Sequence, residues 1–254
     1  MACPQFHWLS AVEPNPIHAI TFDYRWSGGS FGPSSERSIT ADAIEVVDWS
    51  KHDVGIPPSR ILIFSQSLGT AVNMAIAEYY ATQETPIVFA GHILVAPFVD
   101  VPTLVSTYSV AGTIPILGPV AKFPALFNYL RTFIKDDWAT KDRIASYIRA
   151  VEKAKLGYHV TIMHAEDDYD IPWQHSQQVF AHAVAATRSP DLGKDQIEER
   201  KTALRIDKGH AGSVVEWRTE QGVIREEILK YGLHDVIMGN PSVTLAAMRV
   251  FDDL

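Results

Sequence analysis

Hydrophobic residues along this chain gather into short runs that alternate with longer amphipathic stretches. Five runs rich in Ile, Val, Leu or Phe have the length of buried strands and are too short to form helices. They are Ile17–Asp23, Arg60–Phe64, Gly91–Ala96, His159–Met163 and Ala203–Ile206. Apolar residues at helical spacing fill four longer stretches. These are Ser38–Trp49, Gly69–Tyr80, Trp173–Ala186 and Glu216–Tyr231. The alternation predicts an α/β fold with a mostly parallel sheet flanked by helices.

Two regions interrupt this alternation. Asp100–Ala150 is a long insertion between the third and fourth predicted strands, and Ser189–Lys201 is a charged stretch that predicts a loop or short helix. Prolines and charges break the apolar part of the insertion, whereas a bilayer span needs about 20 nearly uninterrupted apolar residues. We therefore expect one domain over residues 1–254, in which residues 100–150 form a cap or lid and Val101–Ile134 supply its apolar surface.

Composition narrows the possible partners. The 254 residues include 22 basic and 30 acidic side chains, for a net charge of −8, which argues against a nucleic-acid partner because phosphate binding needs a basic surface. Cys3 is the only cysteine, so an intrachain disulfide and a cysteine-based zinc site are excluded. The N-terminus lacks the basic and apolar regions of a signal peptide. We expect a cytoplasmic protein, with peripheral membrane contact through the cap.

The motif that carries chemistry follows the strand predicted at Arg60–Phe64. Ser65-Gln66-Ser67-Leu68-Gly69 joins this strand to a helix, as the G-x-S-x-G nucleophile elbow does, with serine in place of the first glycine. The sharp turn of such an elbow exposes the central serine above the sheet. The alternative is that Ser67 only caps the helix.

A serine nucleophile needs a histidine as base and a carboxylate to orient that histidine, in the chain order Ser, acid, His. His210 lies after the strand predicted at Ala203–Ile206, with Gly209 and Gly212 close by. The acid would come from the loop after His159–Met163, where the pattern alone does not choose among four candidates. These are Glu166, Asp167, Asp168 and Asp170.

A metal site is the other interpretation of these side chains. His164, Asp168 and His210 could form a facial set of ligands, but no metal-binding motif has their spacing. We expect neither a metal nor another cofactor.

Several segments resemble one branch of the α/β-hydrolase superfamily. The chain is similar, from about His18 to Lys230, to the abhydrolase-domain lipases that cleave lysophosphatidylserine and monoacylglycerol, and looks N-terminally shortened beside them. The matching segments are Thr21–Arg25, Gly28, Gly32, Ser35–Arg37, Asp42–Ala43, Asp48–Trp49, Gln66–Thr70, Ala96–Phe98 and His164–Asp168.

The resemblance implies a Ser67–His210–Asp168 triad that cleaves a carboxylic ester of the acyl-glycerol or lysophospholipid type. The backbone N–H of Leu68 would supply one oxyanion donor. The superfamily takes a second donor from a loop after an inner strand, and from the resemblance we expect the first strands of the sheet to be missing here. Direct pairing of the flanking strands, the segment Gln5–Val12, or a partner's strand could fill that slot.

Two other functions remain open from the sequence. One is a catalytically silent binding protein with this fold. The other is a hydrolase or thioesterase that trims an intermediate in a biosynthetic pathway, for which the same triad would serve.

Overall fold

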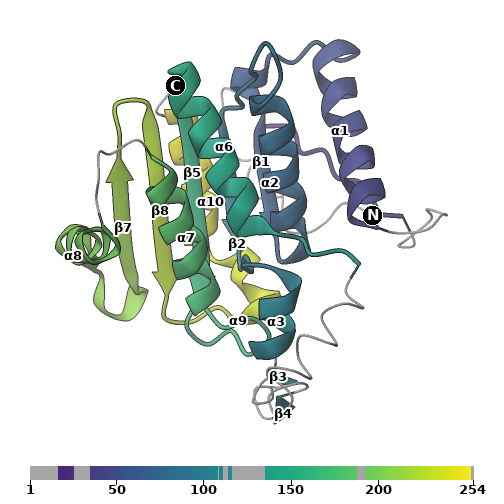
Figure 1. Cartoon of the computed structure of the whole chain (residues 1–254). Helices are drawn as coiled ribbons and strands as arrows, with labels where there is room; N and C mark the ends of the chain where they lie inside the picture. The colour runs from purple at the N-terminus through teal and green to yellow at the C-terminus, as the bar shows by residue number, and fades with distance from the viewer. Residues whose placement is uncertain are drawn as a thin grey trace.

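A six-stranded sheet forms the centre of the molecule in the computed structural model, which describes residues 17–25, 35–107, 109–110, 114–115, 135–187 and 193–252 (Figure 1). The strand order is β1-β2-β5-β8-β7-β6. The strands are β1 (Leu62–Gln66), β2 (Gly91–Val95), β5 (Tyr158–Ala165), β6 (Ile206–Asp207), β7 (Ser213–Arg218) and β8 (Gly222–Leu229). The first four in the sheet order are parallel, and β7 and β6 continue the sheet antiparallel. The predicted α/β class with a mostly parallel sheet is confirmed.

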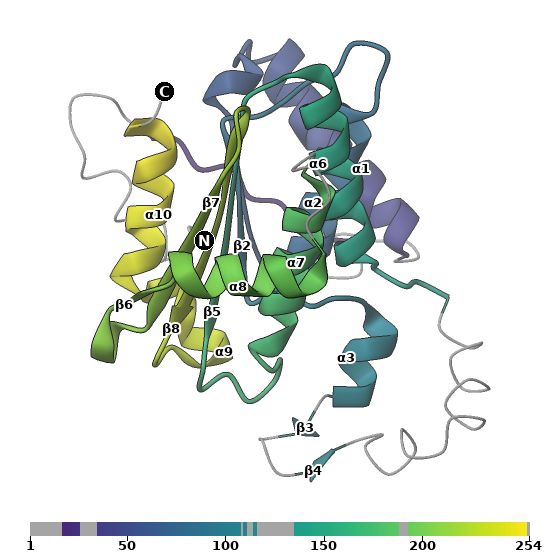
Figure 2. The same cartoon turned by 60° about the vertical axis from the view of Figure 1, so that its left-hand side comes forward.

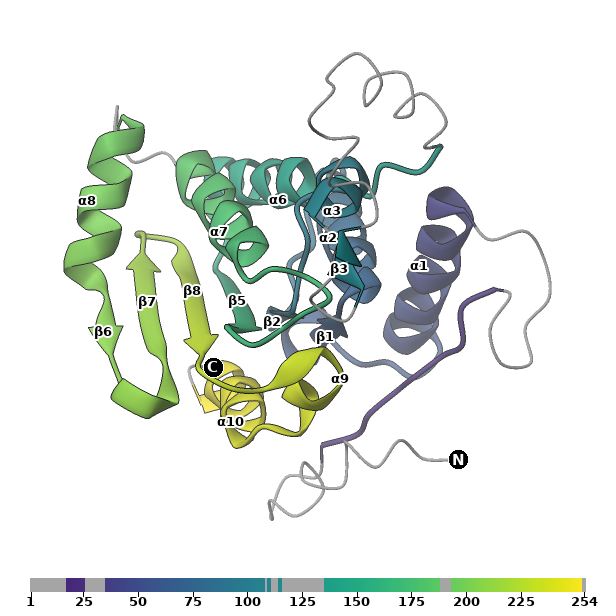
Figure 3. The same cartoon turned by 90° about the horizontal axis from the view of Figure 1, so that it is seen from below.

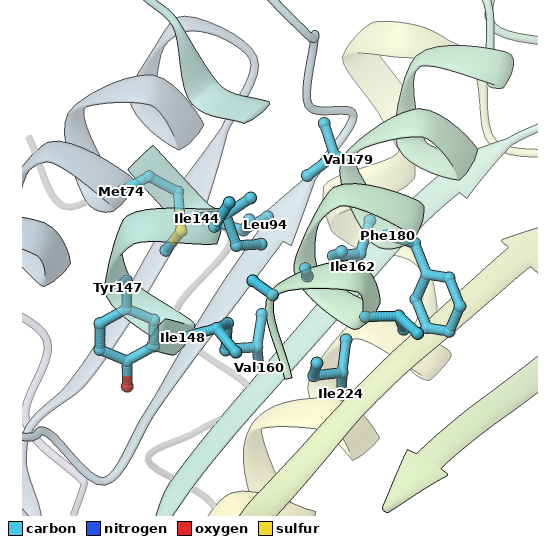
Figure 4. Packing of buried hydrophobic residues seen from close by; sticks show 14 of the residues in the cluster. Met74, Leu94, Ile144, Tyr147, Ile148, Val160, Ile162, Val179, Phe180 and Ile224 are labelled. Carbon is cyan, nitrogen blue, oxygen red and sulfur yellow. The ribbon is translucent and has the colours of Figure 1, made fainter. Parts of the chain in front are cut away.

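Helices cover both faces of the sheet (Figure 2). On one face α2, α6 and α7 pack against the strands, and α1 packs against α2, whereas α10 covers the opposite face. Their bounds are α1 (Glu36–His52), α2 (Leu68–Ala81), α6 (Thr140–Ala154), α7 (Gln174–Ala186) and α10 (Pro241–Asp252). Figure 4 shows the larger core, where Leu94, Ile162 and Ile224 of neighbouring strands meet Ile144 of α6 and Phe180 of α7. This core fixes the spacing of the strand ends.

Shorter elements lie at the ends of the strands. They are α3 (Val101–Thr107), β3 (Ser109–Val110), β4 (Ile114–Pro115), α8 (Lys194–Leu204), α9 (Leu233–Val236) and 3₁₀ turns at Pro58–Arg60, Gly209–Ala211 and Ile237–Gly239. Of the expected cap, residues 108, 111–113 and 116–134 lie outside the described residues. Among the described helices, none is both long and apolar enough to cross a bilayer.

Most predicted elements are present. The strands expected after residues 60, 91 and 159 are β1, β2 and β5, and three of the four predicted helices are α1, α2 and α7. Three predictions were wrong. Ile17–Asp23 joins no strand, Ala203–Ile206 contains the last two residues of α8 and only the first residue of the short strand β6, and Glu216–Tyr231 is not a helix but falls in the hairpin of β7 and β8.

The hairpin forms because its charged residues find partners within the sheet. Arg225 of β8 pairs with Glu216 of β7 and Glu227 of β8, at 2.6 Å each, while Trp217 is fully buried. Gly222 begins β8 beside β5, and a Cβ there would lie 2.3 Å from the carbonyl oxygen of Tyr158. The strand therefore approaches β5 more closely than any larger residue allows.

Strand β1 forms one edge of the described sheet. It pairs with β2, and no strand lies on its other side among the described residues. Its residues are only half-buried, whereas every residue of β2 is buried. The segment Gln5–Val12, considered for this slot, lies outside the described residues, as do positions 26–34 of the family resemblance.

Candidate active site

Ser67 occupies a sharp turn between β1 and α2. Its φ of 52° and ψ of −123° lie in a region that non-glycine residues rarely adopt. Its N–H donates to Val95 O at 3.0 Å, which holds the turn against β2. Leu68 is the first residue of α2, so its N–H belongs to the helical turn whose donors have no intrahelical partner. The predicted strand–turn–helix setting of the motif is present.

The hydroxyl of Ser65, which stands at the first glycine position of the motif, has two hydrogen-bond partners. Ser65 Oγ donates to Ile93 O at 3.0 Å and accepts from Asn73 Nδ2 at 2.8 Å. Asn73 Oδ1 lies 2.7 Å from Nδ1 of His92, and burial lowers the pKa of His92 to about 3, so this imidazole is neutral. The departure from the glycine motif thus links β1 to β2 and α2, two residues before Ser67.

The four candidate acids after β5 have different partners. Glu166 pairs with Lys230 at 2.8 Å, and Asp167 Oδ1 accepts from the backbone N–H groups of Gly232 and Leu233 at 2.8 and 3.0 Å. Asp168 is buried and its carboxylate faces the imidazole of His234, whereas Asp170 is half-buried. The contacts therefore distinguish acids that the sequence pattern left equivalent.

Asp168 and His234 form the central contact of the site. Asp168 Oδ2 lies 2.8 Å from His234 Nδ1, and Asp168 Oδ1 accepts from the N–H groups of Asp170 and Ile171 at 2.9 Å each. Burial alone would raise the pKa of Asp168, but hydrogen bonds from His164, His234 and the Ile171 N–H lower it well below its ordinary value. The carboxylate is therefore charged and only accepts, so His234 Nδ1 carries the hydrogen and Nε2 is left to act as a base.

The position of His234 depends on the turn after β8. Leu233 has a φ of 45°, and Gln66 Nε2 donates to His234 O at 2.5 Å. The residue before Ser67 thus contacts the histidine that faces Asp168. Figure 3 looks onto this edge of the sheet, where α9 lies beside the ends of β1 and β2. The hydrogen bond to Asp168, first, and then its charge raise the pKa of His234 against the opposing effect of burial.

His210 does not meet Asp168, contrary to the expectation from the sequence. It is exposed on the 3₁₀ turn after β6, where it lines an open polar pocket of about 520 Å³ with Glu166, Arg205, Asp207 and Lys230. The reason is topological. Strands β7 and β6 extend the sheet beyond β8, so the loop after β6 starts three strands from β5, whereas the loop after β8 starts beside it.

Sequence reasoning missed His234 because the helix predicted at Glu216–Tyr231 concealed β8. The available signal was Gly232, two residues before His234, directly after a run that contains Val223, Ile224 and Ile228. A strand, a glycine and then a histidine is the same pattern that had singled out His210.

A metal site would use a different set of ligands from the one expected. His164, Asp168 and His210 are not brought together, whereas Asp168, Asp170 and His234 offer atoms within 4.8 Å of one another. Both oxygens of Asp168 already accept hydrogen bonds, two from backbone N–H groups and at least one from imidazole. This arrangement is that of a hydrogen-bonded acid–base pair.

Several curated proteins similar to this chain are named as lipases. The lysophosphatidylserine lipase ABHD12 of Macaca fascicularis is 30% identical over 179 residues, which cover 69% of this chain and 40% of that protein. The Gallus gallus protein of the same name is 31% identical over 68% of this chain and 41% of its own, and protein ABHD12B of Homo sapiens is 30% identical over 73% and 47%. The chain therefore spans less than half the length of these relatives. No protein-family model matches it.

Solved structures show the same architecture. An α/β hydrolase from Vibrio vulnificus superimposes with a TM-score of 0.57 over 91% of this chain and 62% of its own, at 17% sequence identity. At that identity the similarity concerns the fold alone. Together with the sequence relatives, it places the sheet order and the helical layers in a known architecture.

Proposed function

This chain belongs to the α/β-hydrolase superfamily, in the branch of the abhydrolase-domain lipases, and we propose that it is a serine hydrolase that cleaves carboxylic esters through Ser67, His234 and Asp168. The observation that carries the proposal is the 2.8 Å contact between Asp168 Oδ2 and His234 Nδ1, on a histidine whose carbonyl is bonded to Gln66. The same chain order of nucleophile, acid and base is typical of this fold. His234 replaces His210 in the triad that the sequence suggested.

The reaction proceeds in two half-reactions. Ser67 Oγ attacks the acyl carbon while its proton passes to His234 Nε2, and Asp168 stabilises the imidazolium that forms. The Leu68 N–H donates to the oxyanion of the tetrahedral intermediate. The imidazolium then gives its proton to the leaving alcohol, and an acyl-enzyme on Ser67 remains. Water, deprotonated by His234, attacks this ester, and the carboxylic acid leaves as Ser67 regains its proton.

The proposed substrates are carboxylic esters with an acyl chain, of the acyl-glycerol or lysophospholipid type. Support comes from the relatives that are named lysophosphatidylserine lipases and from the predicted apolar cap at Val101–Ile134, which would cover the acyl chain and contact lipid surfaces. The domain would then be a single unit with its cap inserted between β2 and β5. Neither a cofactor nor a nucleic-acid partner enters this mechanism.

The decisive experiment is labelling with a fluorophosphonate probe, which reacts with activated serines. The wild type and His210→Ala are expected to be labelled, whereas Ser67→Ala and His234→Ala are not. His210→Ala is the matched control because it also removes a histidine from a loop that follows a strand. Loss of labelling in His210→Ala with retention in His234→Ala would return the base to His210. A folded wild type without labelling would overturn the proposal in favour of a silent binding protein, and labelling without turnover of acyl-glycerols would favour a pathway thioesterase or hydrolase.

A further inference from the structure

A second imidazole reaches the carboxylate that faces His234. His164 lies near the end of β5 and is fully buried, with Nε2 at 3.1 Å from Asp168 Oδ2 and at 2.9 Å from Ile171 O. Its other nitrogen, Nδ1, lies 2.6 Å from Oγ of Ser176 in the first turn of α7. Asp168 Oδ2 is thus shared between two imidazoles, one from within the core and one from the site.

The partners of His164 determine where its hydrogens lie. A backbone carbonyl and an ionised carboxylate can only accept, so Nε2 of His164 carries a hydrogen and donates. In the neutral ring Nδ1 then accepts from the hydroxyl of Ser176. The polar atoms of the ring are satisfied by three groups from two elements, which leaves the imidazole a single orientation inside the core.

We propose that His164, fixed by Ser176, is a positioning residue for this reaction, because it holds Asp168 Oδ2 in line with Nδ1 of His234. The inference rests on the proposed function. Backbone N–H groups already hold Asp168 Oδ1, so a donor on Oδ2 completes the clamp and prevents rotation of the carboxylate. A carboxylate held in advance needs no reorganisation when the imidazolium forms.

Sharing the oxygen has an electrostatic effect as well. The N–H of His164 withdraws negative charge from Asp168 Oδ2, so Asp168 attracts the proton of His234 less strongly than it would alone. Removal of this donor should therefore raise the pKa of His234 further. A histidine that only filled space in the core would have no such effect.

Other titratable groups surround this pair. Asp170 and Asp235 act on His234 through their charge, and both remain in the His164, Ser176 and His175 variants of this test. His175 of α7 lies near His164 and Asp100, and its burial is the main cause that lowers its pKa to about 4. His175 bonds to Val99 N and Thr107 Oγ1. Its imidazole is therefore neutral where His234 titrates, because the pKa of His234 is raised above its ordinary value while that of His175 is lowered.

The test compares His164→Leu, which removes the donor, with His164→Gln, which keeps an N–H near the position of Nε2. In both variants and the wild type, the His234 Cε1–H resonance is followed by NMR against pH, and hydrolysis of a p-nitrophenyl ester is measured over the same range. His164→Leu should raise the His234 midpoint and lower the plateau of kcat about tenfold or more with KM unchanged. His164→Gln should restore most of both.

Control variants keep the outcome clear. His175→Leu also removes a buried imidazole from this part of the core but does not contact Asp168, so it should leave the midpoint in place. Ser176→Ala should move the midpoint in the same direction as His164→Leu, by less. A midpoint that is unchanged or lowered in both His164→Leu and Ser176→Ala would overturn the inference. The NMR titration needs no turnover, so failure of the proposed function would appear separately, as absence of probe labelling in the wild type.

Discussion

The loops after β8 and after β6 each carry a histidine, and both lie where a strand ends at its carboxyl side. The two loops differ in the hydrogen bonds that hold them. The His234 loop is bonded to two other elements, because Asp167 accepts from Gly232 and Leu233 and Gln66 donates to His234 O. The His210 loop is bonded to itself, through Lys208 N to Gly212 O and Gly209 N to Asp207 Oδ1 among others.

This difference shows what makes a loop histidine suitable for catalysis. A base must be held within a fraction of an ångström of its partners, and only tertiary contacts can do so. Local turns keep the backbone of His210 compact but leave its side chain exposed and two strands beyond the strand that precedes His234. Neighbouring glycines and a position just after a strand are therefore not enough to make a histidine suitable as a catalytic base.

The largest effect is expected from the acid itself. Asp168→Asn should lower kcat about 10⁴-fold, because the amide can donate to Nδ1 and favour the wrong imidazole tautomer. Asp170→Asn, on the same loop, is the matched control and should stay within about threefold of the wild type, since Asp170 acts only through its charge at a distance. Turnover of a p-nitrophenyl ester measures both. Equal losses in the two variants would show that loop charge, and not the Asp168–His234 contact, is what matters.

The second largest effect is expected from the aspartates that accept hydrogen bonds from the backbone of each loop. Asp167→Ala removes the acceptor for two backbone N–H groups beside His234 and should destabilise the fold by about 1–3 kcal/mol, with a loss of activity. Asp207→Ala makes the corresponding change in the exposed His210 loop and should cost no more than about 0.5 kcal/mol. Denaturant unfolding gives the stabilities. If Asp207→Ala lost more activity than Asp167→Ala, the assignment of the working loop would be reversed.

The smallest effect concerns pH. Asp168 raises the pKa of His234 above its ordinary 6.5, and the base must be neutral, so kcat/KM should fall as pH falls through a midpoint above 6.5. Because the raised value belongs to the folded state, His234 adds stability that is fully present below pH 6.5 and is lost as pH rises through the folded pKa. His234→Gln should remove this slope from unfolding free energies, whereas His210→Gln should leave it. A wild-type midpoint below 6.5 would contradict the contact with Asp168.

Much of the fold, and the serine elbow of the site, follow from sequence patterns. The central strands are short, apolar and bounded by turns, so their burial is visible in the pattern, and the serine elbow is visible as small residues between a strand and a helix. Asp168 required the family resemblance, because its neighbours Glu166 and Asp167 differ from it only in tertiary contacts.

The hairpin and its histidine were hidden for a physical reason. Strand β8 carries Arg225, Glu226 and Glu227 in a row, a pattern typical of a solvated helix. In the fold these charges are buried or half-buried against partners, as Glu226 is with Lys201 of α8 at 2.9 Å. Ion pairs between distant segments override local periodicity, and a single sequence gives no sign of them.

The arrangement of the strands also has a consequence for refolding. Residues 67, 168 and 234 come from ends of three parallel strands, and each strand pairs with a neighbour far away along the chain. Loop closure over such separations is slow compared with helix formation. Helical content should therefore return first after dilution from denaturant, and reactivity of the serine should return only when β8 docks onto β5. The time course of probe labelling would report the assembly of this last pair.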